Sequence, residues 1–244
     1  MSGDDPPPAS DDTPPSVSDD GTPSGRGGPV PVNSDEPRKP TGDGAPGFTD
    51  YAADIVGSAG AVLLVGLLLF AVSGVWPPLV AIESPSMEPH IGEGDLVFVM
   101  EEHRFAGPGA QDGVVTAERG AGYVRFQRPG DVIVFAPDGN TARTPVIHRA
   151  MFYVEAGENW YGRADPAAVG GANNCSELAN CPANYSGFIT KGDNNVNYDQ
   201  VGSSPISDPV RPEWVIGTAE WRVPLLGEIR LGWNRATGVA SVGA

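Results

Sequence analysis

One long apolar segment constrains this chain more than any other feature of its sequence. No charged residue occurs from Ile55 to Ile82, and residues 61–72 are almost entirely Ala, Val, Leu and Phe. Roughly 20 apolar residues in a helix span the hydrocarbon core of a bilayer. We therefore predict a transmembrane helix over residues 55–76, with Trp76 as an aromatic anchor at the interface and the prolines after it as the stop.

Two other interpretations of this segment fit less well. A cleaved signal peptide would stand near the N-terminus and have a shorter apolar region, whereas here some fifty residues precede it. A helix buried in a soluble core would carry a polar stripe along one side, and this segment has none.

Basic residues indicate how the predicted span is oriented. Arg26, Arg38 and Lys39 precede it, and no Lys or Arg follows until Arg104. Loops rich in Lys and Arg stay in the cytoplasm. We expect a single-pass protein of the cell membrane with its N-terminus in the cytoplasm and residues 79–244 outside, in contact with membrane lipids.

The residues before the span cannot form a core. Residues 1–50 contain eleven prolines, many Gly and Ser, and acidic pairs such as Asp4–Asp5. Such a composition predicts a disordered, acidic tail.

The charge of the chain excludes one class of partner. Its formal net charge is -16, and its only lysines are Lys39 and Lys191. Nucleic-acid phosphates would repel this surface, so we expect no nucleic-acid partner. A lysine-poor acidic surface also fits a halophilic protein, because concentrated salt screens the repulsion between its charges; an ordinary acidic domain is the alternative.

The segment after the span is predicted to be mainly β. Short β-branched or aromatic runs lie between turn-forming residues, at 95–100, 131–135, 146–148, 151–154 and 187–190. We place a β-rich domain at 79–232, with surface insertions at about 106–123 and 156–186 and a C-terminal tail at 233–244.

The two cysteines, Cys175 and Cys181, lie in the second insertion. A disulfide between them is expected if this part faces an oxidising compartment, and two free thiols are the alternative. No metal is predicted, because the three histidines are scattered and no second ligand pair lies near the cysteines. We expect His90 and His103 to be surface residues, and the cysteine loop to be dispensable for any chemistry.

Several motifs follow the apolar segment in a fixed order. They are Ser84-Pro-Ser86-Met-Glu-Pro89, Gly94-Asp95, Arg128-Pro-Gly-Asp-Val-Ile-Val-Phe135, Val146-Ile-His-Arg149 and Thr190-Lys-Gly-Asp-Asn-Asn195 with Asp199. Together they resemble the conserved boxes of type I signal peptidases, in the archaeal and endoplasmic-reticulum form where histidine replaces the bacterial lysine. The resemblance covers residues from about 55 to 232, and Gly217-Thr-Ala219 and Pro224-Leu-Leu-Gly227 are similar to the closing strands of that family.

The resemblance implies a catalytic triad. Ser86 matches the family nucleophile, His148 the general base and Asp199 the acid partner of that base. A serine hydroxyl is a weak nucleophile and needs an adjacent base to take its proton. An imidazole can do so near neutral pH when a carboxylate fixes its tautomer.

Other matched residues have supporting roles. The resemblance places the Ser84 hydroxyl and the Ser86 backbone N–H in an oxyanion hole. We interpret Asp193 as a structural carboxylate in a turn, and Lys191 as a box residue rather than the base. Pro85 departs from the family, in which many members have glycine, and it lacks the backbone N–H that glycine would offer to a substrate.

The function implied is removal of signal peptides from exported preproteins, by an acyl-enzyme on Ser86, after a small-x-small sequence. Its partners would be signal peptides and, as a further candidate, the protein-export translocon, with no cofactor. Two alternatives stay open: a membrane peptidase with a Ser86–Lys191 dyad, and a non-catalytic surface binding domain.

Overall fold

The computed structural model describes residues 48–226. Most of the predicted tail at 1–50 lies outside this range, as do the domain end at 232 and the predicted C-terminal tail at 233–244. The last three residues assigned to the N-terminal tail instead begin the first helix.

Helix α1 (Phe48–Ser73) contains the apolar segment. Its part from Tyr51 to Ser73, 23 residues, is long and apolar enough to cross a membrane, and none of its most apolar stretch is buried against other parts of the described chain. At 1.5 Å per residue this part is about 35 Å long, which exceeds the roughly 30 Å of a bilayer's hydrocarbon core. The structure thus contains one helix suited to a single-pass anchor.

A glycine, rather than the prolines, ends α1. Gly74 has a φ of +79°, the left-handed conformation typical of the residue after a helix, and its N–H donates to Phe70 O at 2.8 Å. Ser73 fixes the joint to the β domain, because its Oγ donates to Val99 O at 2.7 Å and its carbonyl accepts from Glu101 N at 2.9 Å. The helix therefore ends three residues before the predicted boundary at Trp76.

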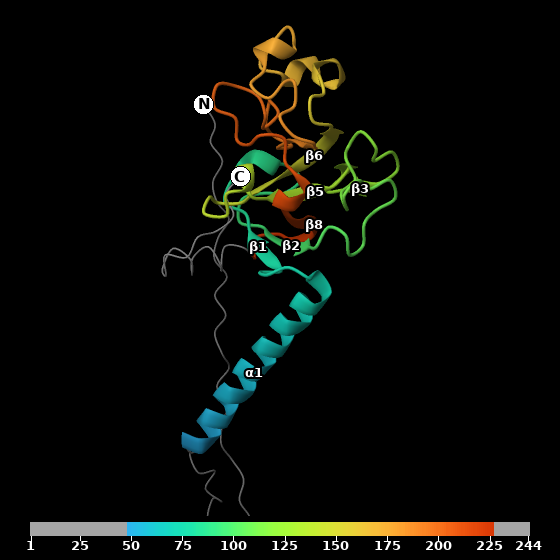
Figure 1. Ribbon diagram of the computed structural model, residues 1–244. Helices are drawn as coiled ribbons and strands as arrows, with labels where there is room; N and C mark the ends of the chain where they lie inside the picture. The colour runs from blue at the N-terminus through green and yellow to red at the C-terminus, as the bar shows by residue number, and fades with distance from the viewer. Residues whose placement is uncertain (1–47, 227–244) are drawn as a thin grey trace, which may run out of the picture. The chain divides into compact units, whose positions relative to one another are not determined.

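The rest of the described chain is β-rich, as predicted. Six antiparallel strands form one sheet in the order β1-β2-β8-β5-β6-β7 (Figure 1). Their bounds are β1 (Leu79–Ala81), β2 (Leu96–Met100), β5 (Val132–Phe135), β6 (Val146–Val154), β7 (Gly187–Lys191) and β8 (Val215–Val223). A second, two-stranded sheet is formed by β3 (Val124–Arg125) and β4 (Arg128–Pro129), which pair with each other and with none of the six strands.

Strand β6 is longer than the sequence predicted. The runs at 146–148 and 151–154 belong to one nine-residue strand, whose first five residues are all buried. Both neighbours along the sheet, β5 and β7, hydrogen-bond to it, and a shift of register between Ala150 and Phe152 marks the point where the sequence pattern is interrupted.

The remaining helices among residues 48–226 are single 3-10 turns. They are η1 (Pro85–Met87), η2 (Pro137–Gly139), η3 (Tyr161–Arg163), η4 (Pro166–Ala168), η5 (Cys175–Glu177) and η6 (Pro212–Trp214). No long helix follows α1 in this part of the chain, in agreement with the lack of helical periodicity.

Neither predicted insertion lies wholly on the surface. Val114 and Val115, in the first, are fully buried, and the carbonyl of Val115 accepts from Asp131 N at 2.7 Å. The second, 156–186, contains the fully buried Trp160 and a disulfide between Cys175 and Cys181. Gly- and Ala-rich composition suggested exposed loops, but a few large apolar side chains anchor both stretches to the core.

Candidate active site

Local sequence explains the shape of the segment that carries Ser86. Ser84 is extended, with φ -142° and ψ 154°, and it precedes the 3-10 turn η1 as its N-cap. Pro85 occupies the first position of this turn, where a backbone N–H would have no partner within the turn and the fixed φ of proline is suitable. Pro85 is therefore compatible with the turn that presents Ser86.

The residue after Ser86 anchors this turn in the core. Met87 is fully buried, whereas Ser86 is half-buried and reaches the surface. Met87 belongs to a cluster of apolar side chains from β1, β2, β5, β6, β8 and the segment 82–91: Val80, Ile82, Met87, Ile91, Val97, Val99, Val132, Val134, Ile147 and Ala219. Burial of one side chain thus fixes the position of the neighbouring hydroxyl relative to β6.

Three predicted residues meet at one point although they lie far apart in sequence. His148 Nε2, on β6, is 3.0 Å from Ser86 Oγ. His148 Nδ1 is 2.7 Å from Asp199 Oδ2, and both of these side chains are fully buried. The hydroxyl, imidazole and carboxylate therefore form a continuous hydrogen-bonded chain that ends at a half-exposed serine.

Asp199 has further partners that orient its carboxylate. Thr190 Oγ1 donates to Asp199 Oδ2 at 2.6 Å, and the backbone N–H of Asp199 donates to Thr190 O at 2.9 Å. Gln200 holds Thr190 in turn, since its Oε1 accepts from Thr190 N at 3.0 Å. The other oxygen, Oδ1, is buried and has no hydrogen-bond partner within residues 48–226.

This arrangement can move a proton away from Ser86. With Nδ1–H donating to Asp199, the imidazole must be in the tautomer whose Nε2 accepts, and Ser86 Oγ–H is within donating distance of it. Transfer of that proton to Nε2 would make the oxygen nucleophilic and create an imidazolium beside a buried carboxylate. The geometry matches that of a serine nucleophile with its general base.

The predicted oxyanion pair is close together but arranged differently from the expectation. The N–H of Ser86 donates to Ser84 Oγ at 3.3 Å, as in a helix N-cap. This contact is long for an N–H···O bond and therefore weak. An oxyanion would have to replace it, after which the amide and the Ser84 hydroxyl could both donate to the same ligand atom.

Asp193 is bound by cations rather than by turn N–H groups. Its two carboxylate oxygens accept from Arg149 Nε at 2.8 Å and Arg149 Nη2 at 2.7 Å, and both side chains are almost fully buried. Arg128 Nη1 lies 3.5 Å away. Burial alone would raise the pKa of Asp193, but the hydrogen bonds and charge of Arg149, with the charges of Arg128 and His90, bring this pKa below its ordinary value. A structural carboxylate was predicted, but its partners were not.

His90, expected at the surface, is only partly exposed. Its side chain is 17% exposed, and its Nδ1 lies 2.9 Å from Asp193 Oδ2, although not in hydrogen-bonding orientation. His90 follows Ser86 closely in sequence, so this contact connects the segment of Ser86 to the loop after β7. His103 is exposed, as expected.

Lys191 does not contact Ser86 through any hydrogen bond in the described chain. Its Nζ donates to the backbone carbonyls of Asn195, at 2.6 Å, and Gly192, at 3.2 Å. Burial, together with the charge of Arg128, lowers the pKa of Lys191 from its ordinary value. The side chain braces the loop after β7, while His148 occupies the position of a base beside Ser86.

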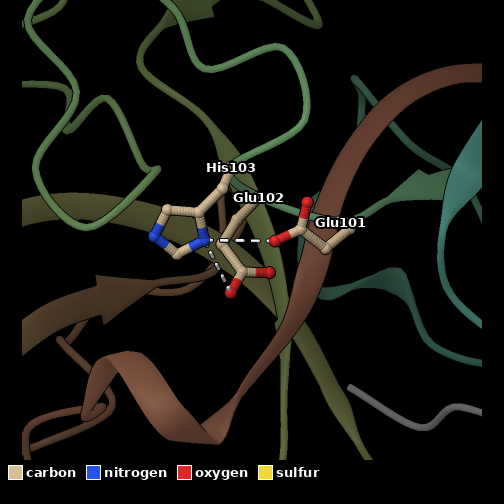
Figure 2. Close-up of side chains that lie close together, drawn as sticks. All are labelled: Glu101, Glu102 and His103. Carbon is tan, nitrogen blue, oxygen red and sulfur yellow. Dashed lines mark hydrogen bonds and ion pairs between the residues drawn. The ribbon is translucent and has the colours of Figure 1, made fainter.

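One group of side chains within residues 48–226 has ligand atoms close enough for a metal ion (Figure 2). His103 Nδ1 lies 3.1 Å from Glu101 Oε1 and 3.4 Å from Glu102 Oε1. An exposed imidazole commonly pairs with carboxylates in this way without a metal. The group does not include Ser86, His148 or Asp199, and we assign it no role.

Comparison with known proteins gives no family for this chain: no family model matches it, and no curated protein matches it.

Several residues of the site were missed in the sequence. Arg149 and Thr190 stand inside the quoted motifs, next to His148 and Lys191, so their position was a signal that could have been used. Gln200 contacts Thr190 only because the chain after β7 turns back on that strand, and no local pattern indicates this.

Proposed function

We propose that this chain is a membrane-anchored serine endopeptidase that removes signal peptides from exported preproteins. One observation carries the proposal: Ser86 Oγ, His148 and Asp199 form a hydrogen-bonded chain with contacts of 3.0 and 2.7 Å. Three separate segments supply these residues, so the arrangement depends on the whole fold and not on a local turn.

The anchor supports the choice of substrate. The helix that could span a membrane ends at Ser73, and Ser86 follows it by thirteen residues. A signal peptide ends its own apolar segment at the same interface, so its cleavage site would come near the hydroxyl. Binding of the peptide as an extended strand, with small side chains before the scissile bond, is the expected mode.

The proposed reaction has two steps. His148 takes the Ser86 proton as the oxygen attacks the scissile carbonyl, and returns it to the leaving amine of the mature protein. Water then hydrolyses the ester on Ser86, again with His148 as base. General-base assistance of this kind is worth about 10²- to 10⁴-fold in rate.

The test is cleavage of a preprotein by membranes that contain the wild type or Ser86→Ala. The wild type should release a mature protein whose new N-terminus follows a small-x-small sequence, and Ser86→Ala should release none. A matched control is Ser203→Ala, which alters an exposed serine outside the site and should cleave like the wild type. Equal cleavage by wild type and Ser86→Ala would contradict the proposal.

A further inference from the structure

The second insertion, residues 156–186, covers the segment that carries Asp199. Its apolar side chains join others from β6, β7 and residues 198–201 in one buried cluster: Phe152, Val154, Trp160, Ala164, Ala168, Val169, Cys175, Leu178, Cys181, Ala183, Ile189, Tyr198 and Val201. Tyr198, the residue before Asp199, is 5% exposed. Its ring meets Phe152 and Trp160 edge-on, with centroids 5.6 and 6.2 Å away.

Hydrogen bonds from the insertion fix the backbone just before Asp199. The N–H of Tyr198 donates to Ala168 O at 3.1 Å, and the phenolic oxygen of Tyr198 accepts from Asp165 N at 3.0 Å. Both ends of this tyrosine are therefore tied to the turn η4 and its cap.

A third hydrogen bond fixes the residue just after Asp199. Asn180 Nδ2 donates to Gln200 O at 3.2 Å, and Asn180 is only 2% exposed. The carbonyl of Asn180 accepts from Trp160 Nε1 at 2.7 Å. Because Asn180 lies inside the loop closed by Cys175 and Cys181, the disulfide restricts the segment that holds Gln200.

These contacts continue to the carboxylate itself. Gln200 bonds to Thr190 through its side chain, and Thr190 Oγ1 donates to the same Asp199 oxygen that His148 contacts. We propose that residues 156–186 position Asp199 for the reaction, with Asn180 as the main positioning residue. The inference rests on the proposed peptidase function. It adds that peptide cleavage depends on residues 156–186.

Loss of the Asn180 side chain should lower kcat rather than weaken substrate binding. Without the Asn180 amide, Gln200 loses one of the contacts that hold it, and Asp199 can move relative to His148. Displacements of about 1 Å around a reacting group can cost as much as 10²-fold, so a decrease of about tenfold in kcat is expected. The KM should change little, because Ser84 and Ser86 lie on another segment. The inference therefore predicts the opposite of the expectation that the cysteine loop is dispensable.

The experiment is a double-mutant cycle with Asn180→Ala and Asp199→Ala in the full-length, membrane-embedded protein. In the wild-type background, Asn180→Ala should lower kcat about tenfold with KM within about twofold. In the Asp199→Ala background, the same change should have almost no further effect, because the group through which it acts is absent. Asn173→Ala, an exposed asparagine of the same insertion that contacts Glu177, is the control and should behave like the wild type.

Each outcome distinguishes the inference from the proposed function. If the wild type is active and Asn180→Ala is as active as the wild type, the inference alone is contradicted. It is also contradicted if Asn180→Ala lowers kcat equally with Asp199 present and in the Asp199→Ala variant, since equal losses indicate a general loss of fold. A wild type that cleaves nothing contradicts the proposed function, and the inference with it. If Asn180→Ala does not fold, judged by its melting curve, Tyr198→Phe replaces it in the cycle: this variant keeps the ring and removes only the hydroxyl, and the same criteria apply.

Discussion

His148 and Arg149 are neighbours on β6, and each binds a different aspartate of the later segment 193–199. His148 contacts Asp199 at 2.7 Å, whereas Arg149 binds both oxygens of Asp193. The sequence analysis gave Asp199 the role of acid partner and Asp193, the last residue of the Thr-Lys-Gly-Asp box, a structural role, but it named no partner for Asp193. Their partners now separate them: Asp199 is adjacent to the imidazole, and Asp193 neutralises a buried guanidinium.

Lowering the pH should reduce the stability that Asp193 gives to the fold. Its pKa is lower in the folded protein than in the unfolded chain, so its ion pairs stabilise the fold above about pH 4 and this contribution is lost as pH falls further. Asp193→Asn leaves buried Arg149 without its counter-charge, which should cost about 3 kcal/mol at pH 7. Melting curves of the purified protein should therefore differ most at neutral pH, and the difference should shrink as the pH falls below about 4.

Glu93→Gln provides the control, because it changes an exposed carboxylate and should leave the melting curves unaltered. A gap between wild type and Asp193→Asn that is constant from pH 7 to pH 3 would show that the ion pairs are not the source of the effect.

Among the helices and strands, the sequence predicted those that a local residue pattern marks. The apolar helix and the runs that became β2, β5, β6 and β7 were foreseen, because hydropathy and β-branched residues act over short distances. Strand β1 was missed, since its three residues, Leu79–Ala81, give too little pattern. The contacts of residues 156–186 with Tyr198 and Gln200 were missed for another reason, because they exist only in three dimensions.

The loop after β7 and the turn η1 contact each other closely. The N–H of Asn194 donates to Ser86 O at 2.8 Å, and a Cβ added at Gly192 would lie 2.7 Å from that same oxygen. Only glycine allows this approach of two backbones.

Gly192→Ala should therefore displace Ser86 from His148 and lower kcat/KM for preprotein cleavage by about 10- to 100-fold. Gly162→Ala is the matched control, because a Cβ there meets nothing within 4 Å. Steady-state cleavage rates of the two variants should be compared, and their melting temperatures measured to exclude unfolding. Activity of Gly192→Ala equal to that of Gly162→Ala would show that this close contact is unimportant.

The described chain has two parts that suit different surroundings: an apolar helix that suits a bilayer, and a β-rich part with a core of its own. The helix has apolar side chains on all sides, as a bilayer requires, whereas the β part has its own buried core. The orientation predicted from basic residues places the β part outside the cell.

Protease added to right-side-out vesicles should digest the β domain and leave a protected fragment that contains the N-terminus and α1. Epitope tags at each end, detected by immunoblotting, would identify the fragments. Digestion of the β domain only after the vesicles are opened with detergent would reverse the orientation.

The proposal that Ser86 acts with His148 as its base is tested by comparing preprotein cleavage by His148→Ala and by Lys191→Ala. His148→Ala should lose at least about 10²-fold in rate while keeping the wild-type melting temperature. Lys191→Ala should retain measurable turnover, because its Nζ binds backbone carbonyls and not Ser86. Full activity of His148→Ala together with an inactive, folded Lys191→Ala would contradict this account and establish a serine–lysine dyad in its place.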